Sequence, residues 1–198
     1  MEAIEKIKEA AALAVPGAQL EIVNSTPAAQ QPALLVDREH VYAIGKFFKE
    51  DPRFQMDFCS CVTGVDYLPK ADKPGFIEVV YHLYSVAQRQ GPIILKVRAP
   101  RELDQCRVPS LTPLWRGCEF QEREAYDLYG VKFDGHPDLR RILMWDEFTD
   151  HPMRKDYVPP ADYEWEPTPH DDTLQRSAQA GGIMPPTAIQ ELEKARKK

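Results

Sequence analysis

The chain has 198 residues, of which 43% are hydrophobic and 28% charged, and its formal net charge is -6. This length supports one domain with a good core, or a domain with a tail. The negative charge gives no electrostatic reason to bind nucleic acid or an anionic lipid surface. The apolar stretch Phe76 to Val80 is far shorter than the roughly 20 residues that cross a bilayer, and the charges within Met1 to Val15 are unlike a signal peptide. We therefore expect no membrane span and a location on the cytosolic side.

The first third of the chain predicts helices and short strands. Apolar residues at helical spacing predict a helix within Met1 to Val15. Strands are expected at Leu20 to Val23 and at Ala33 to Val36. Asp37 has the residue type of an N-cap, so a second helix should follow it and end near Pro52.

The middle of the chain predicts strands. From Phe54 to Val62 the even-numbered residues alternate with the odd-numbered ones as in a strand that has one face on a core, and we expect the even-numbered side chains on that face. The segments Phe76 to Ala87 and Pro92 to Ala99 are joined by Arg89-Gln90-Gly91, a connection short enough for an antiparallel hairpin.

The next segment predicts a helix with recognisable ends. Ser110 can cap a helical region and Pro113 fits its first turn. The helical pattern continues from Gly117 or Cys118 to Tyr129, and Gly130 is suited to a left-handed C-terminal cap.

Beyond Asp146 the chain becomes acidic and rich in proline, so we expect a domain over residues 1–145 and an extended arm over 146–198. Tyr157, Tyr163 and Trp165 favour an arm that lies on a partner rather than in solvent. Thr187 to Gln190 has the form of a capping box, which makes a short terminal helix possible.

The four cysteines are expected to be reduced, because nothing indicates a secretory context. They are Cys59, Cys61, Cys106 and Cys118. Cys59 and Cys61 lie two apart on a predicted strand, which is the closest approach to a soft-metal site. No further close Cys or His spacing accompanies them, so buried structural thiols are favoured over metal ligands.

The run from Glu122 to Phe133, EREAYDLYGVKF, interleaves charges with tyrosines and a leucine. An exposed helix would sort such residues onto separate faces, so we expect these charges to be buried against another polypeptide. Glu122, Glu124 and Asp127 are candidates for a general acid and base, but Arg123 and helical spacing favour an ion-pair network over catalysis.

A short internal echo follows this run. Phe133 to Pro137 and Phe148 to Pro152 each join an aromatic residue to a His-Pro corner, and each is followed by a basic pair. Two similar turns with solvated charges, or recognition of an anion or a partner, are both compatible with this pattern.

Other catalytic motifs are not found. No Gly-rich phosphate loop follows a predicted strand, and no serine lies in a G-x-S-x-G context. Nucleotide binding and hydrolase chemistry are therefore disfavoured.

Two segments together resemble the signature of the C subunit of bacterial respiratory complex I, the NADH:quinone oxidoreductase. They are EREAYDLYGVKFDGHPDLRRILM, Glu122 to Met144, and HPMRKDYVP, His151 to Pro159. The chain departs from the family pattern at Asp150, where a glycine is common, and in the acidic stretch Asp162 to Asp172.

The resemblance implies an α+β fold, a two-layer mixed sheet with helices packed on it and an extended C-terminal arm. It implies a structural subunit without cofactor, whose partner subunits carry FMN and iron-sulfur clusters and pass electrons from NADH to quinone. The expected partners are the quinone-binding D subunit and neighbouring iron-sulfur subunits, at the cytoplasmic face of the inner membrane.

The residues expected at subunit interfaces are those of the two segments: Glu122, Arg123, Glu124, Asp127, Tyr129, His136, Arg140, Arg141, His151, Arg154, Lys155 and Asp156. Two alternatives stay open. One is the same scaffold in a related assembly, such as a membrane-bound hydrogenase or another quinone-reducing dehydrogenase. The other is a small independent metal or redox enzyme built on Cys59, Cys61 and His82.

Overall fold

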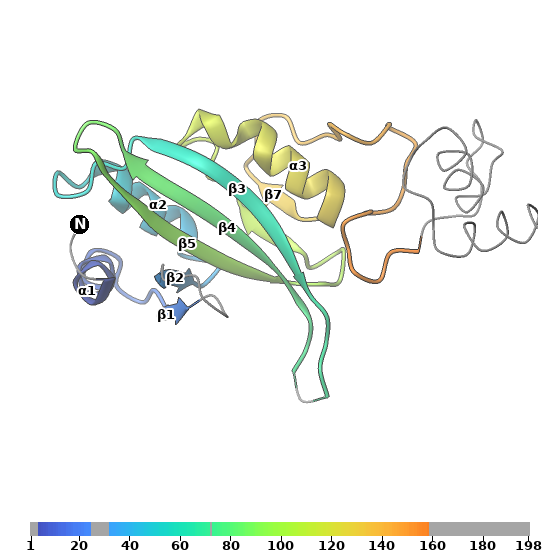
Figure 1. Ribbon diagram of the computed structural model, residues 1–198, viewed down its shortest axis with the longest axis horizontal. Coiled ribbons are helices and arrows are strands. Elements are labelled where there is room, and N and C mark those ends of the chain that lie inside the picture. The colour runs from blue at the N-terminus through green and yellow to red at the C-terminus, as the bar shows by residue number, and fades with distance from the viewer. Residues whose placement is uncertain (1–3, 25–31, 72, 159–198) are drawn as a thin grey trace, which may run out of the picture. The chain divides into compact units, whose positions relative to one another are not determined.

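A mixed five-stranded sheet forms the centre of the fold in the computed structural model, which describes residues 4–24, 32–71 and 73–158. The strand order is β1-β2-β5-β4-β3. The neighbours pair antiparallel except β2 and β5, which are parallel. Figure 1 shows the long strands β3, β4 and β5 side by side, with α2 behind them and α3 along β3. This confirms the predicted α+β class with helices packed on a mixed sheet.

The N-terminal elements follow the sequence pattern closely. They are α1 (Ile4–Ala14), β1 (Leu20–Asn24), β2 (Pro32–Val36) and α2 (Val41–Glu50). The prediction that Asp37 is an N-cap is wrong, because His40 occupies that position and makes no side-chain cap. Asp37 instead accepts hydrogen bonds from the backbone N–H of Gln19 and from the ring of His40. It therefore ties β2 to the start of β1.

The strand β3 (Phe58–Tyr67) starts later than predicted, and only its first residues turn a different face to the core. A register shift lies between Cys59 and Cys61, so one extra residue interrupts the alternation. Phe58 and Ser60 are exposed as a result, whereas Cys59 is buried. The expected burial is thus wrong at Phe58 and Ser60 and right at Phe54, Met56 and Val62.

The predicted hairpin is confirmed as β4 (Phe76–Ser85) and β5 (Gln90–Pro100), which pair antiparallel. A parallel pair of short strands follows, β6 (Arg107–Pro109) and β7 (Lys132–Asp134). Between them lie the 3-10 helix η1 (Arg116–Cys118) and α3 (Glu119–Tyr129). The predicted left-handed cap is confirmed at Gly130, whose φ is 76°. Ser110 caps no helix, because a turn and not a helix follows it at residues 112–114; its hydroxyl donates to Glu122 and accepts from the N–H of Thr112.

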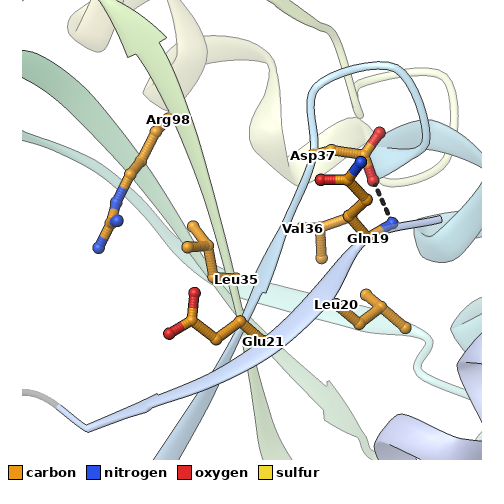
Figure 2. A pocket seen from close by; sticks show the side chains of 7 residues that line it. All are labelled: Gln19, Leu20, Glu21, Leu35, Val36, Asp37 and Arg98. Carbon is orange, nitrogen blue, oxygen red and sulfur yellow. Dashed lines mark hydrogen bonds between the residues drawn. The ribbon is translucent and has the colours of Figure 1, made fainter.

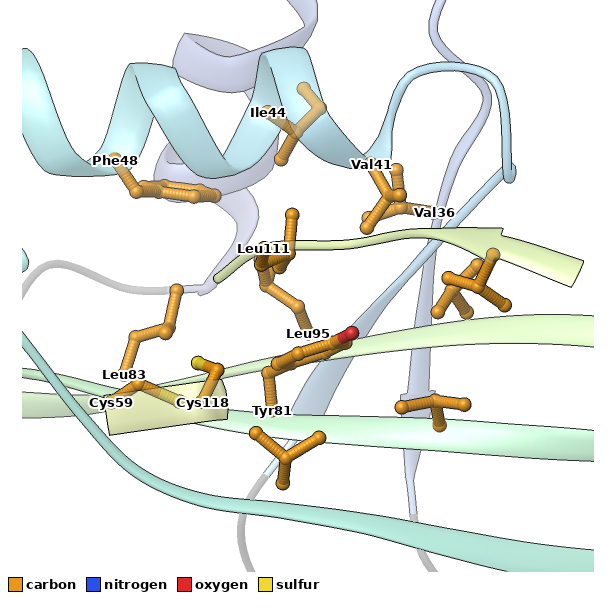
Figure 3. Packing of buried hydrophobic residues seen from close by; sticks show 14 of the residues in the cluster. Val36, Val41, Ile44, Phe48, Cys59, Tyr81, Leu83, Leu95, Leu111 and Cys118 are labelled. Carbon is orange, nitrogen blue, oxygen red and sulfur yellow. The ribbon is translucent and has the colours of Figure 1, made fainter. Parts of the chain in front are cut away.

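The core lies between one face of the sheet and the helices. Figure 3 shows Val41, Ile44 and Phe48 of α2 above Leu83 and Leu95 of the sheet. All these side chains are less than 2% exposed. On the other face of the sheet, Ala33, Val80 and Ile94 form a smaller buried cluster.

The chain divides into two units, residues 1–157 and 158–198. Residues 146–157, where the sequence predicts the start of the arm, belong to the first unit, and Phe148 among them is buried. The rest of the predicted arm, with its possible terminal helix, lies outside the described residues except for Val158. None of the helices in the described ranges is long and apolar enough to cross a bilayer.

Candidate functional site

Glu122 joins the buried side of α3 to two other segments and is 0% exposed. Its Oε1 accepts hydrogen bonds from the hydroxyl of Tyr81 (3.2 Å) and the N–H of Leu111 (2.8 Å). Its Oε2 accepts from the hydroxyls of Ser110 (2.5 Å) and Thr112 (3.0 Å). Burial raises the pKa of Glu122 above its ordinary value, although these hydrogen bonds favour the ionised form. The carboxylate connects parts of the core and is out of reach of a substrate.

Arg123, from the same helix, is 4% exposed and holds the segment after the first His-Pro corner. Its Nε donates to the carbonyl of Arg140 (3.2 Å) and its Nη2 to the carbonyl of Arg141 (3.1 Å). A longer ion pair links Nη1 to Asp138 at 3.7 Å, and the guanidinium lies 5.6 Å from the centre of the Phe120 ring. Arg123 therefore fixes backbone rather than a partner's carboxylate.

Asp127, one turn further along α3, binds the backbone N–H groups of the segment that follows the first His-Pro corner. Its Oδ2 accepts hydrogen bonds from the N–H groups of Ile142 (3.0 Å), Leu143 (2.7 Å) and Met144 (2.8 Å). Its Oδ1 accepts from Nη1 of Arg141 at 2.5 Å. Burial acts to raise the pKa of Asp127, but these hydrogen bonds outweigh it and hold the pKa below the ordinary value.

The two His-Pro corners are attached to opposite ends of α3. The ring of His136 contacts the carbonyl of Glu119 at 3.0 Å, where the helix begins. The ring of His151 contacts the carbonyl of Asp127 at 2.9 Å, near the helix end, and burial lowers the pKa of this imidazole. The echo in the sequence thus corresponds to two equivalent contacts with one helix.

The basic pair after the second corner is divided between two roles. Arg154 donates to the carbonyls of Tyr129 and Arg101, each at 2.7 Å. Lys155 is exposed, and its backbone N–H donates to Asp66 Oδ2 at 2.8 Å. The second signature segment therefore packs on the end of α3 and on β3.

Sequence reasoning missed Asp66 and Arg101. Asp66 is 2% exposed and pairs with Arg101 through two hydrogen bonds of 2.8 and 3.0 Å. Arg101 also pairs with Asp156 at 2.7 Å, and these two acidic partners hold the pKa of Arg101 above its ordinary value. The alternation of Val62, Gly64 and Asp66 along β3 could have placed Asp66 on the buried face.

The predicted interface residues fall into three groups by exposure. Three are buried, Glu122, Arg123 and Asp127; five are half-buried, Tyr129, His136, Arg141, His151 and Arg154; four are exposed, Glu124, Arg140, Lys155 and Asp156. The expectation that another polypeptide buries the charges of the run is wrong for the first group, because segments of this same chain cover and bond them. The predicted ion-pair network at helical spacing is found only in part: Asp127 does form an ion pair, but with Arg141 of the following segment, and Arg123 pairs with Asp138 rather than with a carboxylate of its own helix.

The cysteines are free, and three of them, Cys59, Cys106 and Cys118, are buried. Figure 3 places Cys59 beside Cys118, and Cys61 lies beyond the register shift. Burial raises the pKa of Cys106 to about 11, as expected for an unreactive structural thiol.

One group of three possible metal ligands occurs in the part of the chain that the structure describes: Asp37, Glu39 and His40, with ligand atoms within 4.8 Å of one another. Asp37 Oδ2 lies 2.5 Å from His40 Nδ1, so these two groups already satisfy each other. The arrangement is accounted for as a hydrogen-bonded turn before α2.

A hollow of about 280 Å³ lies beside this turn, at the edge of the sheet. Figure 2 shows Glu21 and Arg98 on its lining, and Asp37 bonded to the backbone of Gln19. Arg98 is already paired with Glu78 at 2.9 Å. The lining holds no nucleophile beside a general base, so it offers no catalytic constellation.

Several curated proteins are similar to this chain. The C subunit of NADH-quinone oxidoreductase from Moorella thermoacetica is 45% identical over 64% of this chain and 79% of its own length. The protein of that name from Citrifermentans bemidjiense is 37% identical over 78% of this chain and 87% of its own. Coverage is lower for the second C subunit of Rhizobium etli, 44% identical over 62% of each chain. The chain thus spans less than two thirds of the length of some relatives.

A solved structure supports the fold and a family model covers most of the described region. A chain of the membrane-bound sulfane sulfur reductase, an archaeal respiratory membrane complex, superposes with a TM-score of 0.59 at 26% identity, over 79% of this chain and 86% of that one. The family model described as respiratory-chain NADH dehydrogenase, 30 Kd subunit, matches residues 34–163, which include α3 and both signature segments. The chain therefore belongs to the family of the 30 Kd subunit of respiratory-chain NADH dehydrogenase.

Proposed function

We propose that this chain is a cofactor-free structural subunit in the peripheral arm of a proton-translocating NADH:quinone oxidoreductase. Partner subunits carry FMN and iron-sulfur clusters and pass electrons from NADH to quinone. This chain contacts the quinone-binding subunit and neighbouring iron-sulfur subunits, at the cytoplasmic face of the inner membrane. Its work is to hold these subunits together.

The observation that carries this proposal is a segment with a fixed backbone and apolar side chains that face outward. Arg123 and Asp127 bind the backbone of residues 140–144 from within. Leu143 is nevertheless 61% exposed, and Met153, whose N–H donates to Leu128, is 53% exposed. Rigid, exposed apolar side chains are typical of a surface that is covered by a partner.

The cysteine positions support the absence of a bound cluster in this chain. An iron-sulfur cluster needs several thiolates on one site. A hydrogen bond with Cys59, together with burial, raises the pKa of Cys118, and burial raises the pKa of Cys106. Thiols in such surroundings are poor ligands.

The test is to place a charge on the outward surface of the affinity-tagged chain in its native host. Leu143→Asp and Met153→Asp should each reduce co-purification of the quinone-binding subunit about tenfold, because a charge buried in an interface is costly. The free energy of unfolding of the isolated full chain should change by no more than about 0.5 kcal/mol, since both side chains face solvent.

Leu13→Asp is the matched control, because Leu13 is 83% exposed on α1, away from the signature segments. This variant should assemble normally. Unchanged assembly of the Leu143 and Met153 variants, or a tagged wild-type chain that retains no subunit of the complex, would contradict the proposed function.

The similarity to a chain of the sulfane sulfur reductase raises a second candidate, the same scaffold in a related respiratory assembly. The names of the curated relatives favour NADH-quinone oxidoreductase over a related assembly. Identification of the electron-input subunits in the purified complex would distinguish the two.

A further inference from the structure

A second apolar surface lies at the other end of the sheet, where β4 turns into β5 (Figure 1). A hollow of about 530 Å³ is lined there by the side chains of Phe58, Tyr84 and Val86, with Arg89 and Gly91 beside them. Phe58 is 49% exposed and Val86 is 67% exposed. Phe58 and Tyr84 are directly opposite each other in the β3–β4 pair, so their rings share one face of the sheet.

The turn that forms this hollow is held in place from behind. The carboxylate of Asp57 accepts hydrogen bonds from the N–H groups of Val86 (2.8 Å) and Ala87 (3.2 Å). The side chain of Gln88 donates to the carbonyl of Pro52 (2.7 Å) and to Gln55 Oε1 (3.0 Å). A surface that is already rigid loses little conformational entropy when a partner binds.

The ring of Tyr84 is fixed by the backbone that faces it. Gly91 has a φ of 132°, and a Cβ on this residue would come within 2.6 Å of Tyr84 Cδ1. Only glycine fits both the backbone conformation and the close approach of the ring. The glycine at position 91 therefore allows the Tyr84 ring to take the position in which it forms the aromatic floor of the hollow together with Phe58.

The charge in the lining of the hollow is positive. Arg89 is the only charged residue in the lining, it is exposed, and no ion pair engages it among the described residues. Its φ of 54° is uncommon for a residue with a side chain. An occupant that reaches the aromatic floor would meet this cation, which favours a carboxylate and disfavours a basic group.

We propose that this hollow receives an apolar side chain with a neighbouring Asp or Glu from another subunit of the same complex. This inference rests on the proposed function. Binding sites for small molecules usually enclose the ligand, and the side chains that line this hollow are too exposed for that. Exposed aromatic and apolar side chains beside a charged residue are instead typical of a protein interface. It would give the chain two contact surfaces, at opposite ends of β4.

The test uses the assembled complex. Val86 is replaced by the photoreactive amino acid p-benzoylphenylalanine, the purified complex is irradiated, and the cross-linked residue is found by mass spectrometry. The expected product joins Val86 to a residue of another complex subunit within a few positions of an Asp or Glu. Arg89→Glu should lower the cross-link yield roughly threefold to tenfold.

Exchanging the charge of Arg89 with that of the partner's acidic residue tests whether these two residues interact. Replacing the partner's acidic residue by Arg should restore the yield in the Arg89→Glu background. Arg116→Glu is the matched control, because the Arg116 side chain is 94% exposed on η1, and it should leave the yield unchanged.

The inference fails if the cross-link joins two residues of this same chain or two copies of it, or if no subunit is cross-linked although the complex is intact. It also fails if Arg89→Glu leaves the yield unchanged. If the tagged chain purifies without complex subunits, the proposed function fails instead.

Discussion

At the scale of single residues, the signature run depends on carboxylates whose burial is compensated by hydrogen bonds. Glu122 accepts four hydrogen bonds, three from hydroxyls and one from a backbone N–H. Asp127 accepts three from backbone N–H groups and one from the Arg141 side chain. A buried charge without such partners would cost several kcal/mol. Two of the three carboxylates that look suited to catalysis, Glu122 and Asp127, are thus the ones that hold the segments together.

Asp127→Asn tests this account at the residue where donors converge. It should lower the free energy of unfolding at pH 7 by about 3 kcal/mol, since the amide removes the charge that the donors face. The folded pKa of Asp127 lies below the ordinary value of 3.8. The stability that the carboxylate contributes is therefore present above that value and is lost as the pH falls through the folded pKa.

Urea titrations of the full chain at several pH values measure this. The difference between wild type and Asp127→Asn should be constant above about pH 5 and should shrink below pH 4. Glu124→Gln, a change at an exposed position of the same helix, should alter stability by no more than about 0.5 kcal/mol. A difference that grows on acidification would contradict the assigned direction of the pKa.

At the scale of elements, the contact between α3 and β3 positions both signature segments. Gln121 of α3 accepts a hydrogen bond from the N–H of Val62 at 2.6 Å, and the ring of Tyr129 covers Gly64. A Cβ on Gly64 would lie 2.7 Å from the ring of Tyr129. The absence of a side chain at Gly64 lets the helix approach the strand.

Gly64→Ala should therefore destabilise the chain by about 2 kcal/mol, measured by urea unfolding, because the ring has to move. Gly117→Ala is the control, since the nearest atom to its Cβ would be 3.7 Å away. Tyr129→Leu should remove at least half of the cost of Gly64→Ala in a double-mutant cycle. Additive effects would show that the two residues do not interact.

Most element types were predictable from the sequence, but the short strands β6 and β7 were not, and the faces that the elements bury were less predictable. Helix and strand patterns, the hairpin and the cap at Gly130 depend on neighbouring residues, which the sequence displays. The register shift after Cys59 depends on how β4 pairs with β3, and Ser110 acts through Glu122 rather than as a cap. Such choices are made by residues that are distant in the sequence.

At the scale of the whole molecule, folding uses the backbone of residues 140–144, and the proposed assembly would use the outward side chains of the same segment. The backbone of residues 140–144 is bound inward by α3, while Leu143 faces outward. Sequence patterns located this segment and the residue types correctly. They could not assign the bonding partners of Glu122, Arg123 and Asp127, since partners within the chain and partners outside it require the same side chains.

The variant Arg123→Ala distinguishes an effect on folding from an effect on assembly. It should lower the free energy of unfolding of the isolated full chain by about 3 kcal/mol and also reduce the yield of the assembled complex. A stabilising osmolyte such as trimethylamine N-oxide should restore assembly of this variant but not of Leu143→Asp. Normal stability with defective assembly of Arg123→Ala would mean that the arginine acts on a partner after all.

The three amides that converge on Asp127 also impose an order of events on a newly made chain. Ile142, Leu143 and Met144 share one acceptor, and it is held on α3, so we expect these three hydrogen bonds to form after the helix. In the proposed assembly, the contact surface around Leu143 would therefore be completed after the helix that supports it. A half-folded chain would then lack this surface, which would limit premature association during synthesis.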